Sequence, residues 1–129
     1  MSKLVPNDSE ADQWFGGRNS VAIDGSVALV GAYRDDNENG VDAGAVYVFD
    51  VATGNQLAKL LPDDGAANDR FGRCAIKGNL AIITAYRDDD NGEDSGSAYL
   101  FDITTGQQIA KLLPNDGAAG DNFGESVSI

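Results

Sequence analysis

The strongest constraint on this chain is that its sequence repeats itself about every 50 residues. The tetrapeptide at residues 3–6 (Lys-Leu-Val-Pro) returns almost unchanged at 59–62 and at 111–114, after 56 and then 52 residues. The dipeptides Phe15-Gly16, Phe71-Gly72 and Phe123-Gly124 keep the same offsets. A fixed period of this length indicates one supersecondary unit stacked repeatedly on its neighbours. The chain is therefore expected to fold as a row of similar units.

Short apolar runs alternate with turn residues inside each unit, as in β-strands. The first unit predicts strands at 20–23, 26–32, 45–49 and 56–61, and the second at 73–76, 79–85, 97–101 and 107–113. Asp24-Gly25 suits a two-residue hairpin turn, and Pro62 ends the fourth strand. No helical periodicity is present, and the 16 Gly residues favour frequent turns. The prediction is an all-β fold.

Four antiparallel strands in about 50 residues form one blade of a β-propeller. The predicted divisions are 1–14 as an end strand with an inter-blade loop, 15–62 as blade 1, 63–114 as blade 2, and 115–129 as the first strand of an incomplete third blade. A closed ring needs roughly four to eight blades, so one copy is not expected to close. The overhanging end strands, 3–5 and the strand ending at Ile129, would be unpaired edges. We therefore expect either part of a longer propeller or a homo-oligomer formed through the end strands.

Several short motifs resemble one known family. Residues 69–72 and 121–124 both read Asp-x-Phe-Gly, and Ser20-Val21, residues 30–32, an Asp-rich loop and residues 44–49 complete the pattern. Together they resemble an FG-GAP repeat. The family's usual Pro is replaced by Tyr33 and Tyr86, and Gly31 is replaced in unit two by Thr84. Unit one has an extra residue between Asp12 and Phe15, and its extra residues at 17–19 suggest a bulge or small loop.

The resemblance implies a propeller of the integrin-α type with a non-enzymatic role in binding or adhesion. It also implies an extracellular or cell-surface parent protein, in which this chain, having no signal peptide, would be a mature form or an excised piece. Calcium-binding members of the family place oxygen ligands at loop positions one, three, five and nine, with Gly at six.

Composition narrows the functional classes further. The net charge of −12 makes nucleic acid a poor partner, and no run approaches the ~18 apolar residues of a membrane span. The chain has no His and a single Cys, which removes the usual catalytic pairs and any disulfide framework. Cys74 lies in an apolar run and is expected in the core. We therefore predict that the protein is not an enzyme.

Two acidic loops are the candidate metal sites. In unit one, Asp35, Asn37 and Asn39 alternate before Gly40, and Asp42 lies one place before the family's ninth position. Alternating oxygen side chains before a tight-turning Gly suit Ca²⁺. Aligning unit two on Gly92 puts Arg87 at the first position, Asp89 at the third and Asn91 at the fifth. The candidate ligands are Asp35, Asn37, Asn39, Asp42, Asp88, Asp90 and Asp94. The alternative is a polar hairpin loop whose side chains hydrogen-bond their own backbone.

Further candidates lie at the strand exits and between the blades. An aromatic ring beside a guanidinium, at Tyr33-Arg34 and at Tyr86-Arg87, suits a sugar or a peptide. The alternative is that each Tyr packs and each Arg pairs with a loop Asp. The acidic residues before each Phe-Gly are expected to cap turns, and the repeated Phe to pack between blades. Those residues are Asp12, Asp69 and Asp121, and Phe15, Phe71 and Phe123.

Three functions follow from these features. The first is a binding or adhesion scaffold with a protein or glycan ligand. The second is a purely structural, self-assembling or engineered propeller unit without a ligand. The third is a carbohydrate-binding propeller that uses the Tyr-Arg exits.

Overall fold

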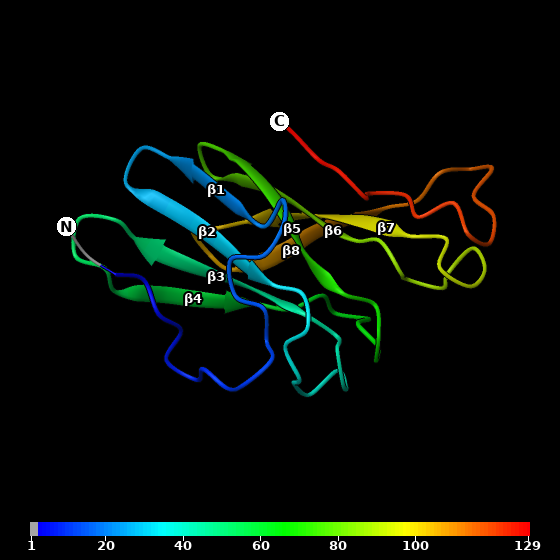
Figure 1. Cartoon of the computed structure of the whole chain (residues 1–129). Helices are drawn as coiled ribbons and strands as arrows, with labels where there is room; N and C mark the ends of the chain where they lie inside the picture. The colour runs from blue at the N-terminus through cyan, green and yellow to red at the C-terminus, as the bar shows by residue number, and fades with distance from the viewer. Residues whose placement is uncertain (1–2) are drawn as a thin grey trace.

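The computed structural model describes residues 3–129, so the first two residues of the predicted segment 1–14 lie outside the described part. Eight strands form two four-stranded sheets, with no helix in residues 3–129 and hence none that could cross a membrane (Figure 1). Blade 1 contains β1 (Val21–Asp24), β2 (Val27–Ala32), β3 (Ala45–Asp50) and β4 (Gln56–Leu60). Blade 2 contains β5 (Phe71–Lys77), β6 (Leu80–Ala85), β7 (Ser97–Asp102) and β8 (Gln107–Leu112).

Each blade is an antiparallel meander in which sequence neighbours are spatial neighbours. The innermost hairpin of blade 1 pairs Asp24 with Val27 across a two-residue turn, where Gly25 has a φ of +57°. Gly78 has a φ of +59° at the same place in blade 2. Glycine adopts this left-handed conformation without a steric cost. The predicted all-β fold with four-stranded blades is confirmed, because every expected strand of the two blades is present to within two residues at each end.

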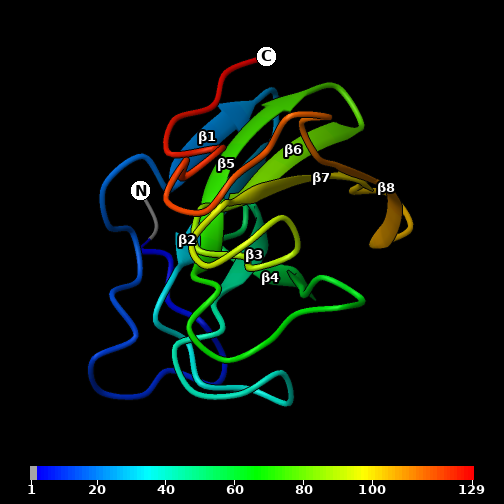
Figure 2. The same cartoon turned by 90° about the vertical axis from the view of Figure 1, so that its right-hand side faces the viewer.

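The two sheets stack face to face, and their strands enclose the largest apolar cluster (Figure 2). Leu29, Val48 and Leu60 of blade 1 pack there against Cys74 and Ile83 of blade 2. Period-two alternation places these side chains on one face of each strand. Full burial of a Leu or Ile stabilises a fold by roughly 1.5–3 kcal/mol, so this interface is a major source of stability.

Phe71 lies in the apolar cluster between the two blades, and Phe15 lies on the opposite face of blade 1. Phe71 packs edge-on against Tyr99 and Phe101, with ring centroids 5.5 and 5.8 Å apart. Phe15 makes the equivalent contacts with Tyr47 and Phe49, at 5.7 and 5.9 Å. Edge-to-face pairs at these distances are favourable beyond the area they bury. The predicted role as a packing anchor between blades is thus confirmed for Phe71, whereas Phe15 packs only on blade 1 and Phe123 is 38% exposed.

Glycine at position 31 is required by the close approach of the two blades. A Cβ atom on Gly31 would lie 1.8 Å from the carbonyl oxygen of Gly72 in β5. The corresponding residue of blade 2 is Thr84, whose hydroxyl donates a 2.6 Å hydrogen bond to the Gly124 carbonyl. The side chain fits there because no complete blade packs against that side of β6.

The two chain ends differ from the prediction. Residues 3–5 and 125–129 are not strands, so the expected overhanging end strands are wrong for the single chain. A strand exists only when its backbone groups have a hydrogen-bonding partner strand, and neither segment has one within residues 3–129. The N-terminal segment nevertheless covers blade 1, where Leu4 packs against the second apolar cluster and the Asn7 amide donates to Gln56.

Residues 17–19, which are additional in unit one, form a small turn, as predicted. The extra residue predicted before Phe15 is wrong, because Gln13 takes the place of Asp69 and the spacing to the Phe is the same in both units. Phe15 makes an isolated bridge to Ala32, and the Ser20 amide then donates to the Gly17 carbonyl before β1 begins. In blade 2 the chain runs directly from Phe71 into β5, with only a register shift between Phe71 and Arg73.

Candidate functional site

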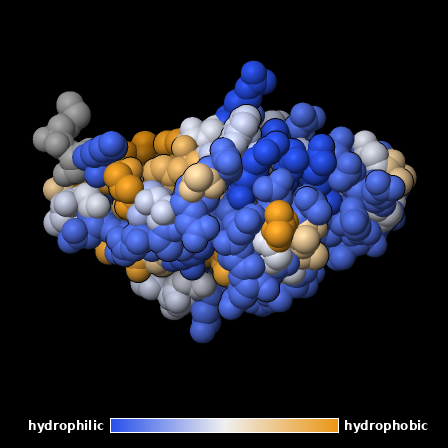
Figure 3. All heavy atoms as spheres, turned by 60° about the horizontal axis from the view of Figure 1, so that its bottom comes forward, coloured by the Kyte–Doolittle hydropathy of each residue, from blue (hydrophilic) through white to orange (hydrophobic). Residues whose placement is uncertain are grey.

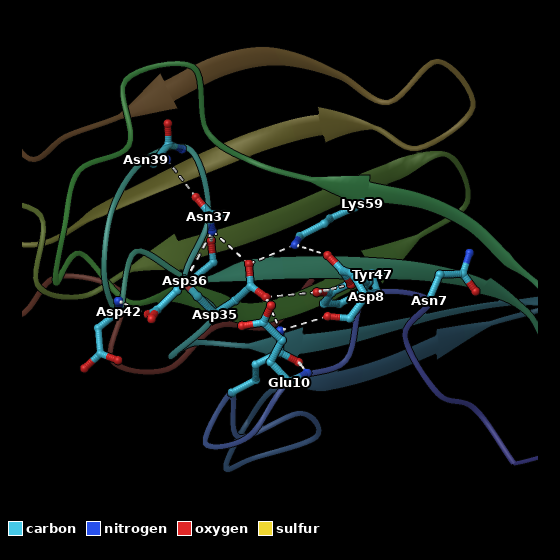
Figure 4. A network of polar contacts seen from close by, with 12 residues as sticks. Asn7, Asp8, Glu10, Asp35, Asp36, Asn37, Asn39, Asp42, Tyr47 and Lys59 are labelled. Atoms are coloured by element: carbon cyan, nitrogen blue, oxygen red, sulfur yellow. Dashed lines mark hydrogen bonds and ion pairs between the residues drawn. The ribbon is translucent and has the colours of Figure 1, made fainter.

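The first acidic loop is organised around a fully buried carboxylate (Figure 4). Asp35 is 0% exposed and lies three residues after the end of β2. Its carboxylate accepts hydrogen bonds from Gln13 Nε2 at 2.7 Å and from Asn37 Nδ2 at 2.9 Å. The ammonium of Lys59, from β4, lies 2.9 Å from Asp35 and 2.5 Å from Asp8. The Tyr47 hydroxyl is within hydrogen-bonding distance of both carboxylates.

The same constellation recurs in blade 2. Lys111 Nζ lies 2.7 Å from the buried Asp88, 2.6 Å from Asp64 and 2.6 Å from Asp90. The Tyr99 hydroxyl is 2.9 Å from both Asp64 and Asp88. A buried carboxylate is tolerated only when it is paired and hydrogen-bonded, and each blade provides this with one Lys and one Tyr. We call these two constellations the lysine–carboxylate clusters.

The surroundings of each cluster shift the pKa values of its groups. Burial raises the pKa of Tyr47 and Tyr99 far above the usual value, and the neighbouring carboxylates raise it further. Burial opposes the charged form of Lys111, but hydrogen bonds to Asp64, Asp88 and Asp90 outweigh it and raise the pKa. The pKa of Asp88 is lowered, because hydrogen bonds led by Lys111 outweigh its burial. The lysines and Asp88 therefore stay charged at neutral pH.

In the blade 2 cluster, the Lys111 ammonium competes with a metal ion for the same carboxylates. Asp64, Asp88 and Asp90 do present ligand oxygens within 4.8 Å of one another. The Lys111 ammonium, however, lies 2.6–2.7 Å from all three carboxylates, and so occupies the position that a cation would take. Two positive charges at this spacing would repel each other strongly.

The remaining predicted ligands of the first loop make other contacts. Asn37 also donates to the Gly44 carbonyl at 3.1 Å, and Asn39 Nδ2 donates to the Pro62 carbonyl at 3.2 Å. Asp42 lies 3.8 Å from Arg70. These side chains hold the loop to its own backbone and to the next blade.

The predicted alignment of the two loops needs a correction. The Asp88 carboxylate, not Arg87, occupies in blade 2 the position of Asp35, because each directly follows the first turn after the second strand and pairs with the β4 or β8 lysine. Asp90 therefore corresponds to Asn37, and its carboxylate pairs with Lys111. Asp94 lies apart, with its amide bonded to Asp89.

The predicted turn caps are found in two of the three units. Asp69 accepts from the Ala66 amide at 2.8 Å, and Asp121 accepts from the Ala118 amide at 2.9 Å. In the first unit Gln13 takes this place instead of Asp12, because it accepts from the Glu10 amide at 3.0 Å. Burial raises the pKa of Asp69 to about 6.

The Tyr-Arg exits lie at the same end of the blades, beside an exposed tryptophan. Trp14 is 53% exposed, and its ring lies 5.8 Å from that of Tyr33. The Arg34 guanidinium lies over the Trp14 ring, 4.8 Å from its centroid. Arg34 forms no ion pair within the described residues, so the predicted alternative of pairing with a loop Asp does not apply to it.

The second exit adds two further arginines. Arg70 donates to the Tyr86 hydroxyl at 3.3 Å, and the Arg73 guanidinium lies 4.3 Å from the centroid of the Tyr86 ring. Arg73 also donates to the Glu125 carbonyl. Arg87 is half-buried, with its amide bonded to the Asp69 carbonyl. The two exits are continuous. Gly72, which lies between Arg70 and Arg73 in the chain, packs against Tyr33 of the first exit.

We define the aromatic–arginine edge as Trp14, Tyr33, Arg34, Arg70, Arg73 and Tyr86. Four of the five arginines of the chain lie in the segments that enter the first strand of a blade or leave its second strand, and the fifth, Arg73, lies in β5. The edge is therefore locally basic in a protein with a net charge of −12.

Sequence reasoning missed the residues that complete both sites. The sequence shows Lys59 and Lys111 only as part of the repeated Lys-Leu-Leu-Pro tetrapeptide, with no sign of a role in the acidic loops. The linkers contain Asp8, Gln13 and Asp64, which belong to no recognisable motif. Their signal is positional, since Lys59 and Lys111, Tyr47 and Tyr99, and Asp8 and Asp64 recur in the same units. Trp14 has no such signal, because Arg70 takes its place in unit two.

Comparison with known proteins agrees with this architecture. The family model of the FG-GAP repeat matches residues 1–49, 55–101 and 107–129. Each matched repeat thus begins at the fourth strand of one blade, or the segment in its place, and runs into the next blade. No curated protein sequence matches the chain.

One solved structure with the same fold is that of the computationally designed Ika4 protein. It shares 18% sequence identity with this chain, with a TM-score of 0.56. The similarity covers 92% of this chain and 58% of Ika4, so the chain spans little more than half the length of that protein. From the repeated motifs, the two four-stranded blades and a family match over most of its residues, this chain belongs to the FG-GAP repeat family.

Proposed function

We propose that this chain is a non-enzymatic β-propeller module whose function is to bind a ligand. Further blades, from other copies or from a longer chain, would complete the ring. The aromatic–arginine edge carries the proposal. An exposed indole with a guanidinium stacked on it and a phenol beside it offers a flat apolar surface next to a free positive charge. Such surfaces suit sugar rings that carry an acidic group.

The ligand class we favour is an acidic glycan. Arg34 has no carboxylate partner within residues 3–129, and its charge is available to a carboxylate or sulfate. The net negative charge of the chain disfavours binding of a strongly anionic polymer such as nucleic acid. Binding of one charged sugar at the aromatic–arginine edge is compatible with that charge. A glycan partner agrees with the extracellular or cell-surface setting, and with the adhesion role, that we propose for the parent protein.

The chemistry of the chain supports a binding role over catalysis. Burial raises the pKa of the Cys74 thiol to about 12, so it is not a thiolate at neutral pH. Lys59 and Lys111 have raised pKa values and stay protonated, which removes them as nucleophiles. A groove of about 410 Å³ between the blades is lined by no titratable side chain.

Binding at the edge predicts a specific pattern of mutant effects. Tyr33→Ala and Arg34→Gln should each weaken binding of an acidic oligosaccharide at least tenfold on a glycan array and in calorimetric titration, because each removes a direct contact. Lys77→Gln is the matched control, since it removes an exposed charge at the far end of β5. Equal affinity of Arg34→Gln and the unchanged protein would disprove the role of the edge.

The sequence suggests that calcium stabilises the acidic loops. The lysine–carboxylate clusters make a weak effect of calcium the expected result. Because Lys59 and Lys111 already neutralise the buried carboxylates, we expect 5 mM CaCl₂ to shift the melting temperature by less than about 1 °C relative to EDTA. A calcium site with a Kd near 0.1 mM would stabilise the fold by about 2 kcal/mol under those conditions and raise the melting temperature by several degrees. The larger shift would show that calcium enters a loop despite the lysine.

A further inference from the structure

The first strand of blade 1 exposes apolar side chains whose counterparts in blade 2 are buried. Val21 and Ile23 are 59% and 64% exposed, whereas Cys74 and Ile76, at the same places in β5, are 5% and 8% exposed. Val21 pairs with Val30 and Ile23 with Ala28, and directly paired residues of antiparallel strands share one face of the sheet. Both side chains therefore lie on the face of blade 1 turned away from blade 2. We call it the leading face.

Blade 2 exposes apolar side chains on its other face, at positions whose counterparts in blade 1 are buried. Leu112 is 38% exposed, but its counterpart Leu60 in blade 1 is 1% exposed. Ile82 and Leu100, which pair with each other across β6 and β7, are only half-buried. Their counterparts Leu29 and Val48 are completely buried beneath blade 2. We call this side of blade 2, turned away from blade 1, the trailing face.

The interface inside the chain is a template for joining these two faces. Between the blades, the trailing face of blade 1 packs against the leading face of blade 2 to form the main apolar cluster. The exposed leading face of blade 1 and the exposed trailing face of blade 2 carry the same two sets of positions, except that Thr84 replaces Gly31, so the contact between two copies must be wider at that point than the contact inside the chain. Figure 3 shows that apolar side chains gather in a few patches on one side of an otherwise hydrophilic surface.

We propose that a second copy of this chain docks its leading face onto the trailing face of the first, head to tail. This inference rests on the proposed propeller module and names its assembly surfaces, but it does not depend on the ligand. Each added copy contributes two blades, so two to four copies would give the roughly four to eight blades of a closed ring.

Docking requires two segments to give way: the C-terminal segment of the first copy, whose Gly124 and Glu125 carbonyls accept hydrogen bonds from Thr84 and Arg73 on the trailing face, and the N-terminal segment of the arriving copy. In the arriving copy, Leu4 packs on blade 1 at the place that corresponds to Leu60 against blade 2, and β8 of the first copy would present Leu112 there. The segment at residues 3–6 makes no strand hydrogen bonds that displacement would break. Contact through whole faces therefore replaces the exchange of end strands that the sequence alone predicts.

The charge of the chain makes the association sensitive to salt. Two copies each carry a net charge of −12, and their repulsion falls as the ionic strength rises. The apolar contact itself is not screened. A head-to-tail assembly of this protein should therefore be stronger at 0.5 M than at 0.05 M NaCl, whereas assembly driven by ion pairs would weaken.

The test is the mass of the full chain in solution, measured by light scattering at about 100 μM in 0.5 M NaCl. We expect at least twice the 13.5 kDa of one chain. Ile23→Asp, on the leading face, and Leu112→Asp, on the trailing face, should each return the mass to one chain. Val41→Asp, at a 63% exposed loop residue outside both faces, is the control and should leave the assembly intact.

Mixing the two variants makes the test specific for head-to-tail docking. Ile23→Asp retains a complete trailing face and Leu112→Asp a complete leading face, so an equimolar mixture should form two-chain species although neither variant does so alone. Circular dichroism checks folding, and Val21→Asp serves as a second leading-face variant if Ile23→Asp does not fold. A one-chain mass for the unchanged protein, or a mixture that stays entirely monomeric, would overturn the proposal; failure of glycan binding would not affect it.

Discussion

Replacing Lys111 with methionine is expected to lower the free energy of unfolding by about 3–5 kcal/mol. The substitution keeps the length of the side chain but leaves Asp88 buried without a counter-charge, beside Asp64 and Asp90. Three carboxylates whose oxygens lie within 4.8 Å would then repel one another. Urea-induced unfolding followed by circular dichroism measures the loss.

Two controls separate the charge effect from lost packing. Lys77→Met removes an exposed lysine with no ion pair in the described part of the chain, and should change stability by less than about 0.5 kcal/mol. Adding Asp88→Asn to Lys111→Met should recover part of the loss, because the neutral amide needs no counter-charge. If the single and double variants were equally unstable, the ammonium would not be the stabilising partner of Asp88.

The pH dependence of Lys111→Met has a definite sign. The pKa of Asp88 is lowered in the folded protein, so its paired form contributes stability above the ordinary Asp pKa of about 3.9, which is lost as the pH falls through the folded value. The difference between the unchanged protein and the variant should therefore be largest near neutral pH and shrink below about pH 3.9. A constant difference across that range would point to lost packing alone.

Replacing Gly31 with threonine is expected to cost at least about 3 kcal/mol, at the upper end for overpacked sites. The new Cβ atom would lie 1.8 Å from the Gly72 carbonyl oxygen, and that atom belongs to the backbone of β5. Blade 2 would have to move away from blade 1 and open the cluster around Leu29 and Ile83. Urea unfolding measures the cost, and faster proteolysis between the blades would reveal the separation.

The matched control is the reverse exchange at the equivalent position of the other blade. Thr84→Gly loses one hydrogen bond to Gly124 and some strand propensity, and should cost only about 1–2 kcal/mol. The asymmetry between the two exchanges is the prediction. Similar costs at both positions would show that close approach of the blades is not what requires glycine at Gly31.

The strands and the blade organisation could be predicted because their signals are local and occur twice. Apolar alternation, Asp24-Gly25 and the Phe-Gly dipeptides each depend on a few neighbouring residues, and the repeat allowed each observation to be checked against its counterpart. The predicted packing role of Phe71 follows in the same way. The end segments failed because a strand at 3–5 depends on a partner strand that the single chain does not provide.

The acidic loops show the limit of local reasoning. The alternation of Asp35, Asn37 and Asn39 suggested a cation, and a cationic group does lie beside Asp35, but it is the ammonium of Lys59 from a strand more than 20 residues away. Spacing within a loop carries no information about a side chain that reaches it from another strand. The one-residue difference between the loops also misaligned Arg87 with Asp35.

The amino-acid sequence by itself determined the family, the all-β fold and the four-stranded blade, because these depend on periodic burial and on turn residues that act locally. Only the tertiary structure decided which groups meet: Lys59 with Asp35, Arg34 with Trp14, and Gly31 with Gly72. It also showed that Ile23 and Leu112 are exposed where their counterparts are buried. The physical reason is that both pairing and burial depend on where neighbouring strands and blades lie in space, which a single repeat does not encode.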